Sequence, residues 1–425
     1  MGEYGHLAGK TASCLWFLDL LFHHKKIKKV LVIAPLSTLH AVWSKEIQAV
    51  CPYIKYTVMH GTRAQRLEAL ASDAKIVITN TDAPRTYELE LMKANFDVII
   101  IDEITDFASV SSLRSKALQK ICARARSVYG LSGNPTAGGL MASFGIGKVV
   151  NPGMLPTKYF TKYRSLIMNQ VTMYEYTPRE GAIEIVNKAL QPAIKFSLEE
   201  CVDLPEIVYE ERYIPLPKET EDLFKTMLNH QIAEYKRGLI TAQTAGVKMI
   251  RLVQILTGFC KTDDGEYIDT DVLPKLQALE EIYHEAGCKL VVFVQSVRVV
   301  DQIKEYLNSK KIKTELIYGD ISLKERTKLI DEFQNGGPSV LVAQVRTMSH
   351  GITLTASHTV VFFGIVMGNG SYQQAVHRIR RIGQTKRQVV IKLISSKFEK
   401  LFFEKMAEIE LTSQDMLSLY DNLGE

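Results

Sequence analysis

The stretch Val98–Phe107 reads VIIIDEITDF, and it is the clearest indication of the fold class in the sequence. Its four leading β-branched residues predict a strand that is buried on both faces, as in a parallel sheet. Amphipathic stretches separate it from similar apolar runs, which are typical of the same kind of strand. These runs are Val30–Ala34 (VLVIA), Lys75–Thr79 (KIVIT) and Ser127–Leu131 (SVYGL). The alternation predicts a doubly wound α/β lobe.

The same pattern returns from about Lys289, so we expect a second α/β lobe. Its predicted strands are KLVVFV, TELIYG, SVLVAQV, TVVFFG and QVVIKLI. The stretch Lys218–Thr257 has helical periodicity and is followed by the polar turn KTDDGEYIDTD. We therefore expect a first lobe over 1–215 with a helical protrusion at about 137–200. A helical protrusion and connection would follow over 216–270, and the second lobe over 271–425.

Composition allows several functions but excludes some. The chain has 425 residues, of which 46% are hydrophobic, and 52 Lys and Arg against 47 Asp and Glu give a net charge of +5. This small excess permits nucleic-acid binding only through a local basic surface. The six cysteines form no CxxC pair, which argues against a zinc site or a disulfide framework. We also expect no membrane segment, since Asp19 interrupts the apolar run Leu15–Phe22.

Gly9-Lys10-Thr11 stands directly before a helical apolar run. Backbone N–H groups at a helix N-terminus attract phosphate oxygens, a lysine adds positive charge, and a threonine hydroxyl can hold Mg²⁺. A full phosphate loop would have glycine where Tyr4 stands, with Gly5 one place away. The tripeptide alone therefore leaves chance or a structural role open.

Asp102 and Glu103 end the predicted strand of Val98–Phe107. At such a place one carboxylate can organise Mg²⁺ and the second can orient the attacking water in phosphoryl transfer. Acidic residues also commonly end strands for structural reasons. However, a GKT followed much later by a strand that ends in Asp-Glu is the order expected of Walker-type ATPases.

A third candidate is the basic segment QQAVHRIRRIGQTKR, over Gln373–Arg387. It could be a solvated helix face. Arg378 and Arg381 are three residues apart, which would place both on one face of a helix. An arginine there could neutralise charge that develops on a γ-phosphate.

These motifs and their order resemble helicase superfamily two, and within it the Swi/Snf (Snf-two) family of DNA-dependent ATPase translocases. The segment RIRRIGQTKRQVVIKLI is similar to that family's most specific signature, with Arg380 where histidine is usual. Other matching segments resemble the family's motifs in order: VLVIAPLSTLHAVWSKEI (Ia), ITNTDA (Ib), DEITDFASVSSLRSKAL (II), LSGNPTAGGL (III), KLVVFVQS (IV) and RTMSHGITLTASHTVVFF (V). The resemblance covers roughly Gly9 to Met406.

The resemblance implies two RecA-like lobes with an ATP site between them, and ATP and Mg²⁺ as ligands. Lys10 and Thr11, next to Gly9, would hold the β- and γ-phosphates, with Thr11 and Asp102 on the metal. Glu103 would position the water, and Arg378 and Arg381 would act as arginine fingers. The second-lobe side would be lined by Gly351 and Gln374.

By the same resemblance, a set of polar and turn residues would track the phosphates of one DNA strand. They are Pro35, Ser37, Thr38, Thr79, Asn80, Arg346 and Thr355. Three residues after the strand Ser127–Leu131 would couple the ATP state to the grip on DNA: Ser132, Gly133 and Asn134. Contacts of this kind predict binding that tolerates any sequence and depends strongly on salt.

The expected function is an ATP-driven translocase that moves on duplex or branched DNA, remodels forks or branches and displaces bound proteins. A strand-separating DNA or RNA helicase is the alternative within the superfamily. A non-catalytic DNA-binding module is the other alternative, because Leu7 replaces a glycine of the phosphate loop and Ile104-Thr105 and Met348-Ser349 also depart from the family pattern. The compact length resembles phage or bacterial members. We therefore expect a monomer in a bacterial or phage-infected cytoplasm, associated with the nucleoid, with replication or recombination proteins as partners.

Overall fold

The computed structural model describes residues 9–133, 139–171, 176–194, 204–230, 232–235, 238–242, 244–348, 353–367, 369–381 and 383–406. The chain divides into two compact units, Met1–Val202 and Asp203–Glu425. Each unit is built around one parallel sheet, so the predicted fold class, α/β with two doubly wound lobes, is confirmed.

The elements of the first unit follow one another in this order: α1 (Lys10–His23), β1 (Val30–Ala34), the π-helix η2 (Leu39–Ser44), α2 (Lys45–Val50), β2 (Tyr56–Met59), α3 (Arg63–Ala71), β3 (Ile76–Asn80), α4 (Ala83–Thr86), α5 (Glu88–Lys93), β4 (Val98–Asp102), the 3₁₀-helix η3 (Ile104–Phe107), α6 (Leu113–Cys122), β5 (Ser127–Leu131), α7 (Ala142–Val150), the 3₁₀-helix η4 (Pro152–Met154), α8 (Phe160–Ile167), β6 (Met168–Gln170), β7 (Tyr176–Pro178) and α9 (Ala182–Ala189). The predicted strands therefore lie where the apolar runs indicated. The edge strand β2 was not predicted.

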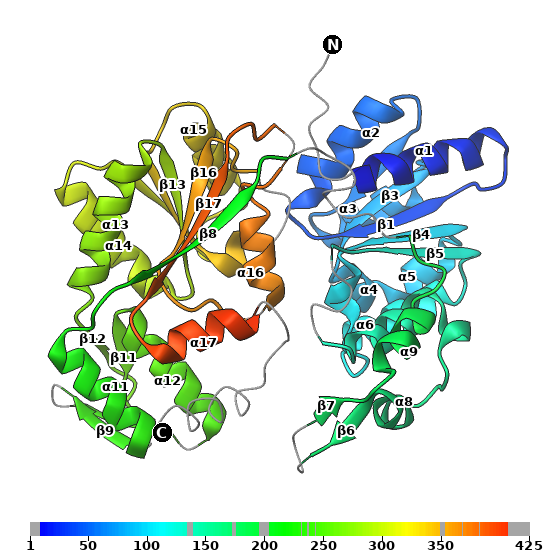
Figure 1. Ribbon diagram of the computed structural model, residues 1–425. Helices are drawn as coiled ribbons and strands as arrows, with labels where there is room; N and C mark the ends of the chain where they lie inside the picture. Colours follow the sequence, from blue (N-terminus) through cyan, green and yellow to red (C-terminus); the bar gives the residue numbers. More distant parts are fainter. Residues whose placement is uncertain are drawn as a thin grey trace. The chain divides into compact units, whose positions relative to one another are not determined.

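The first sheet has the order β2-β3-β1-β4-β5 with every pair parallel. Alternate residues of β1 face opposite sides: Val30 and Val32 pack with α1 and α2, whereas Leu31 and Ile33 pack with α3 to α7. Figure 1 shows these helices on the two faces of the sheet. The connection after β1 runs to one side of the sheet and the connection after β4 to the other. The carboxyl ends of β1 and β4 are therefore the switch point at which such sheets bind ligands.

The elements of the second unit follow in this order: β8 (Ile207–Tyr213), α11 (Lys218–His230), β9 (Ile232–Tyr235), β10 (Gly238–Thr241), α12 (Ala245–Thr257), β11 (Phe259–Lys261), β12 (Tyr267–Asp269), α13 (Leu273–Ala286), β13 (Lys289–Val294), α14 (Val297–Ser309), β14 (Thr314–Ile317), α15 (Leu323–Gln334), β15 (Val340–Gln344), the 3₁₀-helix η5 (Val345–Met348), β16 (Ser357–Phe362), α16 (Asn369–Val376), β17 (Gln388–Ile394) and α17 (Lys397–Met406). Its parallel sheet has the order β14-β15-β13-β16-β17-β8. Helices α13 and α14 cover one face, and α11, α12, α16 and α17 pack on the other (Figure 1).

The division of the chain differs from the predicted boundaries. Strand β8 lies before position 215 but pairs with β17 along seven residues, so it belongs to the second sheet. Helices α11 and α12, predicted as a protrusion, contribute Leu223 and Leu252 to the core of the second unit. Helices α7, α8 and α9 of the segment at about 137–200 belong to the first unit, where a small core of their own surrounds Phe144 and Tyr163.

Candidate nucleotide site and nucleic-acid surface

The N-terminus of α1 has the properties of an anion site. Gly9 precedes it with φ of +66°, a left-handed conformation that favours glycine. Within the described residues, the first turn of α1 contains no acidic residue and has no side-chain cap. The first N–H groups of a helix have no partner within the helix, and together with the helix dipole they favour a negatively charged ligand. The predicted positions of Tyr4, Gly5 and Leu7 lie outside the described residues.

Two predicted site residues lie within electrostatic range of one partly buried thiol of α1, that of Cys14. Burial raises the pKa of Cys14 to about 11; the charge of Asp102 raises it further, and the charge of Lys10 lowers it. Lys10 and Asp102 are 92 positions apart in chain order but both lie within electrostatic range of Cys14. The structure therefore brings the two halves of the predicted nucleotide motif to the same corner of the first unit.

Asp102 is held by an interaction that sequence reasoning missed. The indole Nε1–H of Trp43 donates a hydrogen bond of 3.0 Å to Oδ2 of Asp102. Trp43 belongs to η2, the π-helix that follows β1, and its side chain is fully buried. A tryptophan within the stretch that resembles motif Ia was the only available signal, and it does not indicate a partner.

Glu103 has an unusual backbone conformation. Its φ of 53° and ψ of 57° place it in the left-handed region, and it caps the 3₁₀-helix η3. A non-glycine residue in this region carries strain of about 1–3 kcal/mol, and such residues concentrate at functional sites. The conformation turns the chain sharply between Asp102 and η3.

These residues fit a nucleotide with Mg²⁺. The described residues contain no group of three or more His, Cys, Asp or Glu side chains that could hold a metal by itself. Mg²⁺ in nucleotide sites is normally held by one or two carboxylates together with substrate phosphates. Asp102, Thr11 and the N-terminus of α1 offer that set, and Gly9 presents no side chain against a phosphate.

The predicted DNA residues of the first unit lie at the carboxyl ends of β1 and β3, but several are turned inward. The Thr38 hydroxyl is buried and donates to the carbonyl of Pro35 at 2.9 Å, and Pro35 itself is buried. Thr79 is fully buried and donates to the Met59 carbonyl at 3.2 Å. Ser37 and Asn80 are partly exposed. Of this set, Ser37 and Asn80 are the side chains able to meet a ligand in the described conformation.

Basic residues that sequence reasoning missed surround Asn80. Arg66 donates to Asn80 Oδ1 at 3.0 Å. Arg66 and Arg63 both lie over the Tyr87 ring, at 5.5 and 5.6 Å from its centroid. Burial, and then the charge of Arg66, lowers the pKa of His60. The signal was the pair of arginines three residues apart on α3, directly after the turn at Gly61. Arg63 is also paired with Glu90 at 2.8 Å, so Arg66 is the cation that these contacts place directly at Asn80.

The predicted coupling residues follow β5. Ser132 is partly exposed, and Gly133 is exposed with open space where a side chain would be. Asn134 lies outside the described residues. Helix α7, which comes next in the described chain, packs so closely on the loop after η3 that Gly145 has no room for a Cβ beside the carbonyl of Ala108. Packing thus joins the segment after β5 to the loop after Glu103.

Arg378 and Arg381 do not lie on a helix as the spacing predicted. Helix α16 ends at Val376, and both arginines lie in the turns that follow. The Arg378 carbonyl accepts a hydrogen bond from the Leu354 N–H at 2.9 Å, which uses the group that a continued helix would need. The two residues are only 5% and 7% exposed. Their proximity nevertheless holds, because burial and then the charge of Arg378 lower the pKa of Arg381 to about 9.

Two buried guanidinium groups near one another favour an incoming anion. Arg381 donates to Thr353 Oγ1 and to the His377 carbonyl, both at 3.2 Å, so its orientation is fixed. Charge that burial disfavours becomes more stable when an anion is added nearby. Gln374 and Thr355 are partly exposed in the same unit. Gly351 and the side chain of Arg346 lie outside the described residues.

Gln384 secures this segment. Its side-chain amide donates to the carbonyls of Ser357 and Thr355 at 2.9 and 3.3 Å, and its Oε1 accepts from the Lys386 N–H at 3.2 Å. The glutamine of the Ile-Gly-Gln signature therefore ties the arginine turn to the start of β16. It is 6% exposed, so its described role is structural.

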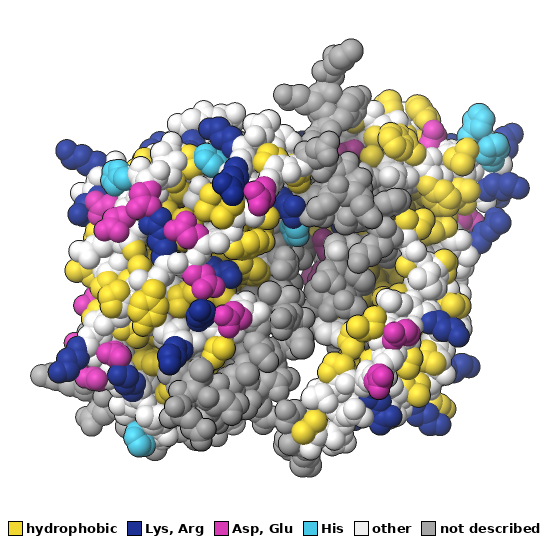
Figure 2. Space-filling model, viewed as in Figure 1, with side chains coloured by type: hydrophobic (Ala, Val, Ile, Leu, Met, Phe, Trp, Pro, Cys, Tyr) yellow, Lys and Arg dark blue, Asp and Glu magenta, His cyan; other side chains and the backbone are white. Residues whose placement is uncertain are grey.

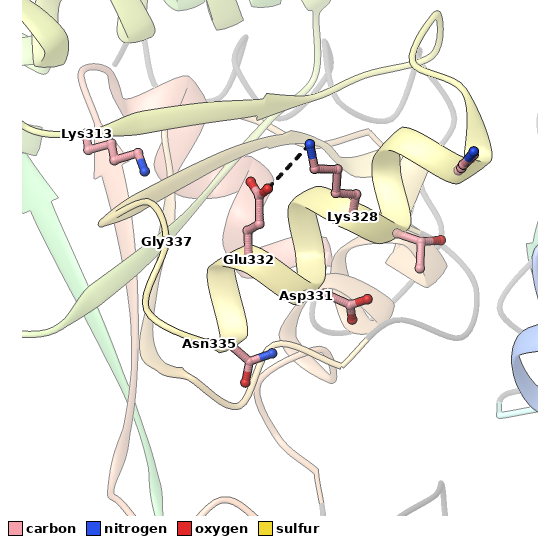
Figure 3. Close-up of a pocket in the computed structure, with 8 residues that line it drawn as sticks. Lys313, Lys328, Asp331, Glu332, Asn335 and Gly337 are labelled. Carbon is pink, nitrogen blue, oxygen red and sulfur yellow. Dashed lines mark ion pairs between the residues drawn. The ribbon is translucent and has the colours of Figure 1, made fainter.

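The other described surfaces give weaker evidence for a functional site. Basic and acidic side chains are interspersed on the visible face of the second unit (Figure 2), in line with the net charge of +5. An open hollow beside α15 is lined by both signs of charge, and Lys328 and Glu332 form an ion pair there at 3.7 Å (Figure 3). No predicted site residue lines it. Within the described ranges, no helix is both long and apolar enough to cross a membrane.

Comparison with known proteins identifies the family. The chain matches the SNF2-related domain over residues 5–264 and the helicase conserved C-terminal domain over residues 274–383. An uncharacterized ATP-dependent helicase of Mycoplasma genitalium is 25% identical over 420 residues, which cover 96% of this chain and 39% of that protein. The chromodomain-helicase-DNA-binding protein 1-like of Mus musculus is 25% identical over 414 residues, or 90% of this chain and 44% of that protein.

The chain thus spans less than half the length of these relatives. Among solved structures, the Sulfolobus solfataricus SWI2/SNF2 ATPase core in complex with dsDNA has a TM-score of 0.43 and 22% identity, with coverage of 97% of this chain and 88% of that chain. The first domain match alone includes more than half of the residues. This chain belongs to the SNF2-related domain family and carries a helicase conserved C-terminal domain.

Proposed function

We propose that this chain hydrolyses ATP with Mg²⁺ and uses the energy to move along duplex or branched DNA. The observation that carries the proposal is that Trp43, which donates a hydrogen bond to Asp102, packs in the same core as Leu15 of α1, the helix that begins at Lys10 after Gly9. A cation, an acidic metal ligand and free N–H groups in one place are what phosphoryl transfer requires. The relatives, which include uncharacterized ATP-dependent helicases, support the same class.

Each residue then has a defined task. The α1 N-terminus and Lys10 bind the β- and γ-phosphates, and Thr11 and Asp102 hold Mg²⁺. The metal neutralises charge that develops on the phosphate oxygens. Glu103 orients the attacking water from its strained position, and Arg378 and Arg381 of the second unit supply positive charge to the γ-phosphate.

DNA binding is proposed for the surface around Ser37 and Asn80. Arg66 adds positive charge beside Asn80, and basic groups that meet phosphates read no base sequence. We therefore expect affinity for duplex DNA to be independent of sequence and to fall steeply with salt. Ser132 and Gly133 would report the ATP state to this surface through the packing of α7.

The test is ATP hydrolysis with and without duplex DNA, together with Glu103→Gln. We expect duplex DNA to stimulate hydrolysis, and the substitution to reduce turnover by at least about 100-fold, since general-base assistance contributes that much or more. Binding of ATP and DNA should persist, because the amide keeps the shape of the side chain. Glu68→Gln on the exposed side of α3 is the matched control and should leave turnover unchanged.

Further arms separate the alternatives. Unwinding of forked duplexes would indicate a strand-separating helicase, whereas displacement of a third strand without unwinding supports translocation. DNA binding without any ATP hydrolysis would indicate the non-catalytic DNA-binding module. Unchanged turnover in Glu103→Gln would remove Glu103 from its proposed role.

A further inference from the structure

The hydrogen bond between Trp43 and Asp102 connects two parts of the proposed machinery. Trp43 lies in η2, immediately after the Pro35–Thr38 turn that ends β1, and Asp102 ends the neighbouring strand β4. The bond thus crosses the switch point of the first sheet, over a separation of 59 residues. One side of it is the proposed DNA-facing turn and the other is the proposed metal ligand.

The surroundings of Trp43 fix its position. The side chain is fully buried in the same core cluster as Leu15 and Leu18 of α1, the helix whose N-terminus is the proposed phosphate site. Leu39 of its own helix belongs to that cluster too. A large aromatic group in close-packed surroundings cannot shift without moving its neighbours. Movement of η2 is therefore transmitted to Asp102 and to α1.

The local helix geometry is also unusual. Residues Leu39–Ser44 form a π-helix, and the Ser44 hydroxyl donates to the Leu39 carbonyl at 3.0 Å. Such helices are rare and often occur at functional sites. Because this wider helix contains Trp43, a change to ordinary α-helical winding would rotate the indole relative to Asp102.

The chemistry of the indole suits this position. An indole N–H is a neutral donor with no acceptor. It can fix Oδ2 of Asp102 without cancelling the negative charge that Mg²⁺ requires, as a lysine or arginine partner would. Oδ1 of the carboxylate, which accepts no hydrogen bond from the described residues, is left for the metal.

We propose that Trp43 is a positioning residue that aligns Asp102 for Mg²⁺ and links DNA engagement at the turn after β1 to the metal site. This inference rests on the proposed function and adds its regulation. DNA that displaces the Pro35–Thr38 turn shifts η2, and the indole then alters the orientation of Asp102. Binding of DNA and of Mg²⁺-nucleotide are in consequence thermodynamically coupled, and each ligand changes the affinity of the other by the same factor.

The two tryptophans of the chain permit a direct measurement. Trp16 is 65% exposed on α1, so Trp16→Phe leaves buried Trp43 as the sole indole fluorophore. We expect Mg²⁺ with a non-hydrolysable ATP analogue, adenylyl imidodiphosphate, to change Trp43 emission, and the analogue with EDTA to change it much less. An emission unaffected by Mg²⁺, in a protein whose calorimetry shows Mg²⁺-dependent binding of the analogue, overturns the inference.

Trp43→Phe tests the hydrogen bond, with Trp16→Phe as the matched control. The phenyl ring keeps most of the apolar contacts and removes the donor. Loss of a group that orients a metal ligand typically lowers metal affinity by 10–100-fold. We expect Mg²⁺-dependent affinity for the analogue to fall by about tenfold or more, and the effect of duplex DNA on that affinity to shrink.

The outcomes are distinguishable. If Trp43→Phe retains both the Mg²⁺-dependent affinity and its response to DNA within about twofold, well below the expected loss, Trp43 is only a core residue. If the unaltered chain binds no Mg²⁺-nucleotide, the proposed function fails and the inference fails with it. Should Trp43→Phe not fold, as circular dichroism would show, the fluorescence of Trp16→Phe still decides the question because Trp43 is present there.

Discussion

At the scale of single residues, the buried arginine pair offers a sharp test. Arg381 is fixed by Thr353 and His377, and burial and Arg378 lower its pKa to about 9. Burial disfavours the positive charge of Arg381, and a nearby γ-phosphate would stabilise that charge. If it does, Arg381→Ala should lower turnover by about 10³-fold or more, as loss of an arginine finger does. Steady-state hydrolysis measures turnover, and a DNA titration of the same preparation measures the affinity for DNA.

The control for this prediction is Arg298→Ala, an arginine of the same unit that is 2.9 Å from Asp269 and whose side chain is 40% exposed. It should affect neither turnover nor DNA affinity by more than about twofold, since exposed ion pairs contribute little. A uniform loss of DNA affinity in Arg381→Ala, with normal turnover per bound complex, would instead identify Arg381 as a DNA-phosphate contact.

Residue-scale features show where sequence reasoning ends. Asp102 and Glu103 could be found because they follow a strand whose apolar run is continuous. The partners Trp43 and Arg66 could not, because they lie 59 and 14 residues away from Asp102 and Asn80 and no local pattern specifies those contacts. The inward hydroxyls of Thr38 and Thr79 likewise depend on backbone carbonyls that only the folded turns present.

At the scale of elements, all the predicted strands formed, including the edge strands β5 and β14, whereas the edge strands β2 and β8 were missed. β4 and β13 are apolar runs and appear at their predicted limits. β2 is half-buried, and β8 alternates between partly buried and exposed residues, so neither produces a continuous apolar run. The predicted helix through Arg378 and Arg381 failed because tertiary hydrogen bonds end α16 early, which spacing alone cannot reveal.

The contact between α7 and the loop after η3 leads to an element-scale prediction. A Cβ at Gly145 would overlap the backbone carbonyl of Ala108, so Gly145→Ala must displace α7 or that loop. Overpacking of this kind costs about 1–3 kcal/mol, more than the roughly 1 kcal/mol that alanine gains over glycine within a helix. We expect a lower free energy of unfolding of the first unit in urea.

Turnover should fall as well, since only η3 separates the displaced loop from Glu103. Gly153→Ala is the matched control, because its Cβ would make only an ordinary contact of 3.6 Å with Asn151. Equal stability of Gly145→Ala and the unaltered chain would mean that α7 and the loop can separate freely, and the proposed link between the segment after β5 and Glu103 would be lost.

At the scale of the whole molecule, the chain consists of two units with separate sheets and separate cores. Units of this kind can unfold in separate steps. The second unit is closed by a buried ion pair between Lys275 of α13 and Glu399 of α17, at 2.9 Å and with 2% and 0% of the side chains exposed. Glu399 also accepts a hydrogen bond from the Ser395 N–H at 2.6 Å. The Glu399 side chain therefore connects α17 to α13.

Glu399→Gln leaves the Lys275 charge buried without its counter-ion, which typically costs about 3–5 kcal/mol. Hydrogen exchange followed by mass spectrometry should show the loss of protection in peptides from β13 to β17, while peptides from β1 to β5 keep theirs. Glu404→Gln on the same helix is the control, since its pair with Lys400 is 4.0 Å long and half-exposed.

Replacement of both partners by Lys275→Met and Glu399→Leu should restore much of the stability, because no buried charge then remains unpaired. If the double variant is as unstable as Glu399→Gln, shape at this position and not charge sets the stability of the unit; if peptides of both units lose protection together, the two cores unfold as one.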